Sequence, residues 1–182
     1  MKQRIFSVAV LVVGLLASKT VCAQGAVQAA RNAAQGIQGK VEDNQLPLTA
    51  GPADKKEKNA PGKIDSNATR EFKTTNSGLK YRVLRNSELK KPKATDSVEV
   101  HYKGWLDDQS IFDSSYREGK SISFPLNRVI KGWTEGMQLI GQGGMIELEI
   151  PYELGYGEQG TPGGPIPPKA KLHFVVELIS IK

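Results

Sequence analysis

The stretch Val-Ile-Lys-Gly-Trp at residues 129–133 lies in a predicted short helix, around which the rest of the fold is organised. Asn127 can cap the first turn of this helix through its side-chain oxygen. Val129, Trp133 and Met137 are four residues apart, so they share one apolar face. The helix is expected to end at residues that supply backbone freedom, the glycines Gly141, Gly143 and Gly144.

Four other segments alternate apolar and polar residues, as half-buried strands do. They are Gly78–Val83, Val98–Tyr102, Ile146–Ile150 and Leu172–Leu178. Several such strands with a single helix among them favour an antiparallel sheet with one face in water. We therefore predict an α+β fold, in which an antiparallel β-sheet is wrapped around one short α-helix.

Residues 1–23 have the composition of a cleaved signal peptide. Basic residues Lys2 and Arg4 precede an apolar stretch from Ile5 to Ala17, and small residues follow up to Ala23. The apolar stretch is too short to span a bilayer comfortably, so no stable membrane span is expected. We predict an exported protein, periplasmic or secreted, whose mature chain begins at Gln24.

Cys22 is the single cysteine of the 182-residue chain. The alternative to cleavage after Ala23 is a bacterial lipoprotein anchored through Cys22. Lys19 and Val21 depart from the leucine and the small residue that usually precede a lipidated cysteine. If Cys22 is removed, the mature protein has no thiol, and its fold must rest on its core.

Residues 24–70 contain no aromatic residue and are rich in Ala, Gly, Lys and Asn. Such a composition buries too little apolar area to offset chain entropy, which predicts a flexible segment. Within it, five apolar residues have helical spacing, typical either of a dimerising helix or of a frayed tail: Val27, Ala30, Ala34, Ile37 and Val41. Gly36 and Gly39 interrupt this stripe and favour the tail, and the oligomeric state stays open. Residues 71–182 are predicted to form the folded domain.

The charge pattern argues against several classes of function. The formal net charge is +6, but the signal segment contributes three basic residues and no acidic one. Lys and Arg are not interleaved with aromatic residues, so no nucleic-acid partner is expected. His101 and His173 fall on the polar faces of their strands, without a nearby carboxylate or cysteine cluster, so no metal site is predicted.

Four blocks carry a resemblance to a known family: Val-His-Tyr-Lys-Gly at 100–104, Phe-Asp-Ser-Ser at 112–115, Val-Ile-Lys-Gly-Trp at 129–133 and Gly-Pro-Ile-Pro-Pro at 164–168. In this order and spacing they resemble the FKBP family of peptidyl-prolyl cis-trans isomerases. The resemblance covers roughly Glu71 to Lys182 and is nearest in style to exported bacterial members of the macrophage infectivity potentiator type. It implies an isomerase domain that is active as the fragment 71–182.

The resemblance also implies which residues form the site. Trp133 would be the floor of a proline-sized pocket, and Asp113 and Tyr156 would be its polar pair. The implied catalytic residues are Tyr102, Phe112, Asp113, Tyr156 and Phe174. The implied substrate-binding residues are Ile122, Val129, Ile130, Trp133 and Ile166. Ile122 stands where the best-known eukaryotic relatives have an aromatic residue, so this wall is expected to be thinner and macrolide inhibitors to bind less tightly.

An apolar site of this kind needs no cofactor. Rotation about an X-Pro peptide bond has a barrier of about 18–20 kcal/mol because the planar amide is stabilised by resonance. The twisted amide is less polar than the planar one, so a water-poor pocket favours the transition state. The expected partners are proline-containing polypeptides that fold after export. The alternative is a non-catalytic chaperone or binding module for extended, proline-containing chains.

Overall fold

The computed structural model describes residues 47–182. The predicted signal peptide, Cys22 and the apolar stripe from Val27 to Val41 lie outside the described residues. Leu48–Lys182 form one compact unit. Within residues 47–182, the helices are too short and too polar to cross a membrane.

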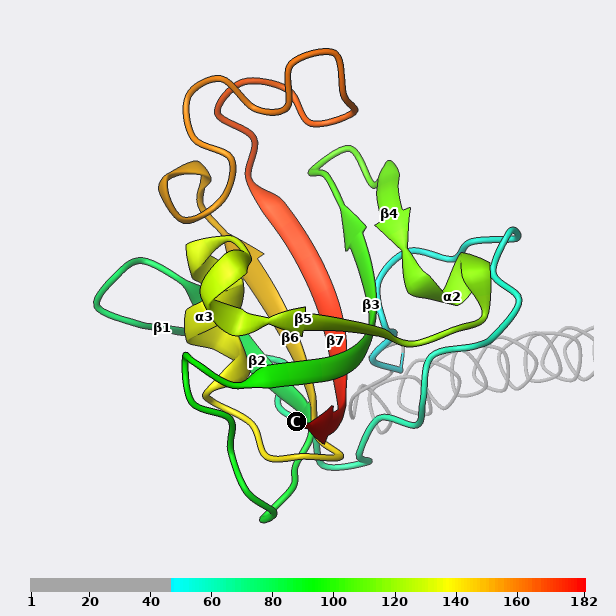
Figure 1. The fold of residues 1–182 in the computed structure, drawn as a ribbon. Helices are drawn as coiled ribbons and strands as arrows, with labels where there is room; N and C mark the ends of the chain where they lie inside the picture. Colours follow the sequence, from blue (N-terminus) through cyan, green and yellow to red (C-terminus); the bar gives the residue numbers. More distant parts are fainter. Residues whose placement is uncertain (1–46) are drawn as a thin grey trace, which may run out of the picture. The chain divides into compact units, whose positions relative to one another are not determined.

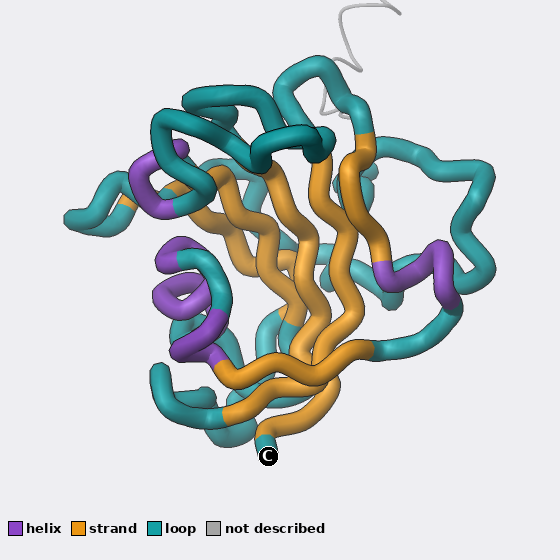
Figure 2. Tube along the Cα trace, turned by 45° about the horizontal axis from the view of Figure 1, so that its top comes forward, coloured by secondary structure: helices purple, strands orange, loops and turns teal. Residues whose placement is uncertain are grey.

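Seven strands form one antiparallel sheet, and Figures 1 and 2 show this sheet bending around the longest described helix, α3. The strands are β1 (Lys73–Thr74), β2 (Lys80–Arg85), β3 (Ser97–Trp105), β4 (Ile111–Ser114), β5 (Ile122–Pro125), β6 (Met145–Ile150) and β7 (Leu172–Ile181). Their order is β1-β2-β6-β7-β3-β4, and β5 also pairs with β3. The helices are α2 (Ser115–Glu118) and α3 (Lys131–Met137), with 3-10 turns η1 (Leu126–Arg128) and η2 (Tyr152–Leu154).

The predicted α+β fold is confirmed. The four alternating segments lie in β2, β3, β6 and β7, and the predicted helix corresponds to α3. The strands that the alternation did not predict, β1, β4 and β5, have between two and four residues. Segments this short contain too few residues to show a period of two.

Both ends of α3 differ from the prediction. The helix ends at Met137, with Gln138 as its C-cap, before it reaches Gly141. Asn127 lies in η1, and the N-cap of α3 is Ile130, which makes no side-chain capping bond. Extended backbone at Val129 (φ −110°, ψ 174°) separates η1 from α3. Glycine in α3 lets the helix approach the sheet closely, because a Cβ atom on Gly132 would lie 2.5 Å from Ile150. The helix therefore packs directly on β6 and fills the inside of the sheet.

The inner face of the sheet and α3 enclose the main hydrophobic core. Its buried side chains come from both elements and from the loops beside them, among them Val98, Val100, Leu126, Trp133, Met137, Ile146, Leu148, Ile150, Leu172, Phe174, Val176 and Leu178. Burial of a large apolar side chain contributes about 1.5–3 kcal/mol. This core therefore holds α3, and the loop before it, in a defined place.

The outer face of the sheet is covered, which corrects the prediction that it faces water. A second apolar cluster lies there, formed by Leu84, Trp105, Met145 and Val175. Leu48, Ala50 and Ile64 pack against it from the N-terminal side of the domain. We call residues 48–64 the strap; Figure 1 shows it in cyan, on the side of the sheet opposite α3.

The strap also corrects the prediction of a flexible segment up to Arg70, because over residues 48–64 that segment packs on the domain. Charged residues that composition counts as solvated find partners on β3 and α2. Glu57 pairs with the buried Lys103 at 3.0 Å, and Asp54 pairs with Arg117 at 2.5 Å. Such long-range pairing is invisible in local composition, since each partner lies far away in the sequence.

Glu177 is a second carboxylate that joins the strap to the outer face. It accepts hydrogen bonds from Tyr116 Oη at 2.6 Å, from the backbone N–H of Gly62 at 2.7 Å and from Arg85 at 2.9 Å. Burial acts to raise the pKa of Glu177, but these three donors together outweigh burial and lower it below its ordinary value. The folded protein therefore holds Glu177 in its ionised form.

We expect Glu177 to make stability fall in acid. Because its pKa is lower in the folded than in the unfolded state, its contribution is present above the unfolded pKa and is lost as pH falls through the folded pKa. Glu177→Gln is expected to lower the free energy of unfolding by about 1–3 kcal/mol at pH 7. Urea titrations at pH 7 and pH 3 should show this difference shrinking in acid. A difference that is unchanged at pH 3 would contradict the assignment.

Candidate functional site

A pocket of about 440 Å³ opens beside α3 on the inner side of the sheet. Strands β3, β4, β5 and β7, the segment between η1 and α3, and the loop after η2 all contribute to its wall. Its lining residues are Tyr102, Phe112, Asp113, Phe124, Arg128, Val129, Ile130, Trp133, Tyr156 and Phe174. The lining is mainly apolar, with polar groups from few residues, as is usual in small-ligand sites.

Trp133 forms an aromatic floor and is only 4% exposed. Three rings meet it edge to face, with centroid distances of 5.3 Å to Tyr102, 5.8 Å to Phe124 and 5.3 Å to Phe174. This is the geometry that aromatic pairs prefer, so the rings hold one another in place. Among the described residues, Trp133 Nε1 is the one buried side-chain polar atom without a hydrogen-bond partner. The floor is therefore an aromatic surface whose one polar atom has no hydrogen-bond partner.

A glycine on β3 makes room for the aromatic wall. A Cβ atom on Gly104 would lie 2.6 Å from both Phe112 and Phe174, closer than atoms pack. These two rings meet edge to face at 5.5 Å. Gly104, the last residue of the block at 100–104, is therefore needed for these two rings to pack in the pocket wall.

The polar side of the pocket is built around Asp113. Tyr102 Oη donates a hydrogen bond to Asp113 Oδ2 at 2.5 Å. Burial, together with this bond to a carboxylate, raises the pKa of Tyr102 well above its ordinary value. Burial and the charge of Asp113 likewise raise the pKa of Tyr156, although its side chain is 44% exposed. Both phenols therefore remain protonated donors at neutral pH, next to one carboxylate.

The structure brings together most of the residues that the resemblance implied. Eight of them line the pocket: Tyr102, Phe112, Asp113, Val129, Ile130, Trp133, Tyr156 and Phe174. Ile166 does not line it; this residue is buried in the core cluster, and Thr161 Oγ1 accepts a hydrogen bond from its backbone N–H at 3.1 Å. Ile122 does not line it either and is 41% exposed on β5.

Two lining residues, Phe124 and Arg128, were not predicted. Phe124 lies two residues after Ile122 on the same face of β5, and its ring reaches Tyr102 and Trp133. The residue of β5 that contributes to this wall is therefore Phe124, and Ile122 lies outside it. Strand β5 is too short for its alternation to indicate Phe124, and no sequence signal marked Arg128.

Comparison with known proteins shows which family this chain resembles. A family described as FKBP-type peptidyl-prolyl cis-trans isomerase matches residues 88–179, half of the chain. The FKBP-type peptidyl-prolyl cis-trans isomerase FkpA of Aeromonas hydrophila is 46% identical over 140 residues, 74% of this chain and 52% of that protein. The macrophage infectivity potentiator of Trypanosoma cruzi is 51% identical over 107 residues, 58% of this chain and 54% of that protein.

A solved structure agrees with this match. The crystal structure of FkpA from Escherichia coli has a TM-score of 0.59 and 34% sequence identity, covering 99% of this chain and 75% of that one. The chain spans about half the length of the first curated relatives it matches, between 40% and 52%. The match and the aromatic pocket fall in the same part of the chain. The chain therefore belongs to the FKBP-type peptidyl-prolyl cis-trans isomerase family.

Proposed function

We propose that this chain is an exported peptidyl-prolyl cis-trans isomerase that accelerates rotation about X-Pro bonds in folding proteins. The observation that carries the proposal is the aromatic pocket, in which a buried Trp133 floor faces the hydrogen-bonded pair Tyr102 and Asp113. The predicted signal peptide supports export to the periplasm or beyond the cell. It lies outside the described residues.

The pocket suits the chemistry of the twisted amide. Uncatalysed X-Pro isomerisation takes tens to hundreds of seconds, because the planar amide is stabilised by resonance. The proline ring would lie on Trp133, between Phe112 and Phe174. A twisted amide carries less charge separation than a planar one, so aromatic surroundings with little water favour the transition state.

The polar groups would orient the substrate and transfer no proton. Asp113, held by Tyr102, would face the carbon of the rotating carbonyl, and Tyr156 would donate a hydrogen bond to the substrate backbone beside it. Ile130 is the N-cap of α3, so its backbone N–H takes no part in the internal bonds of the helix and is placed to bind a substrate carbonyl. Val129 would complete the apolar wall on this side.

The test uses the chain 24–182 and a short, neutral X-Pro peptide. NMR exchange spectroscopy measures the rate at which the peptide isomerises. We expect rapid exchange with the wild-type protein. Folded wild-type protein that does not accelerate exchange would refute the proposal. Peptide binding under those conditions would favour the alternative, a chaperone or binding module for proline-containing chains.

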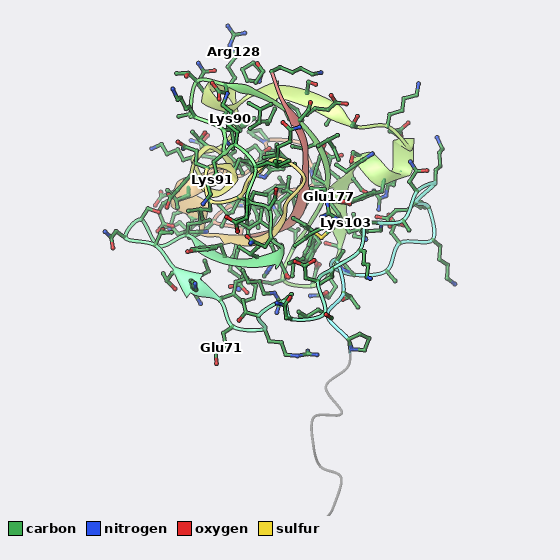
Figure 3. All side chains as sticks on the ribbon, turned by 90° about the horizontal axis from the view of Figure 1, so that it is seen from below. Glu71, Lys90, Lys91, Lys103, Arg128 and Glu177 are labelled. Carbon is green, nitrogen blue, oxygen red and sulfur yellow. The ribbon has the colours of Figure 1, made fainter. Side chains whose placement is uncertain are left out.

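Arg128 is expected to give this site a preference for acidic substrates. Arg128 lines the pocket, is exposed, and makes no hydrogen bond or ion pair within the described part of the chain. Figure 3 shows it at the edge of the domain. Exposed charge pairs contribute about 0.2–1 kcal/mol, so a Glu-Pro peptide should be processed up to about fivefold faster than the matching Lys-Pro peptide. The preference should weaken at high salt.

The matched variants are Arg128→Gln and Lys120→Gln. Lys120 is an exposed lysine that does not line the pocket, so its replacement removes the same charge elsewhere. The ratio of kcat/KM for the two peptides should approach one in Arg128→Gln and stay at the wild-type value in Lys120→Gln. An equal change in both variants would mean that net charge, and not Arg128, sets the ratio.

A further inference from the structure

The strap reaches the back of the pocket through Glu57. The Glu57 side chain is 9% exposed and that of its partner Lys103 is 3% exposed, with 3.0 Å between Lys103 Nζ and Glu57 Oε1. The same carboxylate oxygen accepts a hydrogen bond from Ser114 Oγ at 3.2 Å. Lys103 also donates to the carbonyl oxygen of Pro52 at 2.9 Å. One carboxylate thus connects the strap to two neighbouring strands, and Figure 3 labels its partner Lys103.

These two partners are the chain neighbours of the polar pair in the pocket. Lys103 follows Tyr102 on β3, and Ser114 follows Asp113 on β4. Lys103 and Ser114 are direct partners in the β3–β4 register. Side chains alternate between the two faces of a sheet, so Glu57 joins the strands on the outer face and the Tyr102–Asp113 hydrogen bond joins them on the inner face.

Strand β4 has little other support. It is an edge strand of four residues that pairs with β3 alone, and its register shifts next to Gly104. Phe112 and Asp113, both in the pocket wall, lie on this strand. An edge strand with so few ladder bonds opens more easily than a central one. A contact that fixes β4 to β3 from outside therefore also fixes the pocket wall.

Further contacts of the strap continue this support into α2. The backbone N–H of Lys58 donates to the carbonyl oxygen of Tyr116 at 2.9 Å, and Asn59 Nδ2 donates to that of Gly119 at 3.0 Å. Asp54 pairs with Arg117 on the same helix. The segment that follows Asp113 is thus held along its length by the strap.

We propose that Glu57 is a positioning residue for the isomerase reaction: through Lys103 and Ser114 it sets the relative place of Tyr102 and Asp113. The proposal rests on the proposed function, because it concerns the same site. The Glu57 side chain forms its ion pair and hydrogen bond with Lys103 and Ser114, neither of which lines the pocket. Its effect on catalysis passes through the two strands, and a displacement of about 1 Å at a reacting group can lower a rate about 100-fold.

The first experiment compares Glu57→Gln with wild type in the chain 24–182, using a neutral X-Pro peptide. The glutamine has the same shape but leaves the Lys103 ammonium without its counter-charge. We expect kcat to fall about tenfold or more. We expect KM to change less, within about twofold, since the floor at Trp133 and the wall at Val129 come from other elements. The NMR signals of Tyr102 and Asp113 should shift.

Asp65→Asn is the matched control. Asp65 directly follows the strap, and its carboxylate accepts a hydrogen bond from the backbone N–H of Asn86 at 2.9 Å, at the end of β2 and away from β4. This variant loses the same charge by the same chemical change. Its kcat should equal that of wild type. A kcat in Glu57→Gln that also equals wild type, while the peptide is isomerised, would overturn the proposal and leave the proposed function intact.

A double variant separates positioning from stability. Lys103→Met added to Glu57→Gln removes the unpaired buried ammonium, so the urea midpoint should recover. Without the Lys103 ammonium the strap loses both of its contacts with this residue of β3, the ion pair to residue 57 and the hydrogen bond to Pro52, so kcat should stay low. If kcat recovers in parallel with the urea midpoint, Glu57 acts through stability alone and the proposal is wrong. Wild-type protein without isomerase activity would refute the proposed function itself.

Discussion

Replacing Asp113 by leucine is expected to lower kcat/KM for a neutral X-Pro peptide by about 10- to 100-fold. The leucine leaves Tyr102 Oη, which donates to Asp113 at 2.5 Å, without an acceptor inside the pocket. A polar group left unpaired costs about 1–3 kcal/mol, and 1.36 kcal/mol corresponds to a tenfold rate. The carboxylate is also lost from the side of the pocket that the rotating amide would face. NMR exchange with the purified chain measures the effect.

Two further variants identify the source of this loss. Asp113→Asn keeps a carbonyl oxygen that can accept the bond from Tyr102, so its loss should be smaller. In Tyr102→Phe the donor is absent, so adding Asp113→Leu to it should cost less than in the wild-type background, as expected for interacting residues. Full additivity of the two changes would show that the hydrogen bond is not the relevant feature. Unaltered activity in Asp113→Leu would refute the site.

The main strands and the helix could be predicted because their signal is local. The segments in β2, β3, β6 and β7 alternate over enough residues to show a period of two. The boundaries of α3 were less predictable. Asn127 is a good cap by residue type, but η1 occupies that position and Val129 is extended, because the core draws Leu126 and the chain around it inward.

The site could be predicted as far as the motifs reach. Tyr102, Phe112, Asp113 and Trp133 belong to blocks whose spacing identified the family, and each of them lines the pocket. Phe124 lies outside those blocks. Which residue of β5 faces the pocket depends on the register with β3, where Phe124 pairs with Val98. Register is a property of two strands and cannot be read from one.

The strap was mispredicted for a different reason. A composition average over residues 24–70 treats each charge as solvated. The segment also contains few apolar residues whose burial could offset chain entropy. In the structure a few of those residues find specific partners: Ile64 reaches the cluster around Trp105, and Glu57 reaches Lys103. Few contacts suffice when the receiving surface is already formed by the sheet.

Deleting the strap is therefore expected to cost much of the stability of the domain. The fragment 71–182, predicted from sequence to be active alone, would expose the cluster around Trp105 and leave Lys103 without Glu57. Removal of one partner from a buried ion pair costs about 3–5 kcal/mol, and the lost apolar packing adds to this. Small domains are stable by only about 5–15 kcal/mol. We expect the urea midpoint of 71–182 to fall far below that of 24–182.

The fragment 47–182 is the matched control, since it retains the strap and begins where the described residues begin. Its urea midpoint should lie far above that of 71–182. Lys103→Met should recover part of the lost stability in 71–182, where the ammonium has no partner, and should destabilise 47–182, where it has one. A midpoint for 71–182 equal to that of 47–182 would mean that the strap rests on a domain already stable without it. The opposite signs of Lys103→Met in the two fragments would show that the buried charge requires the strap.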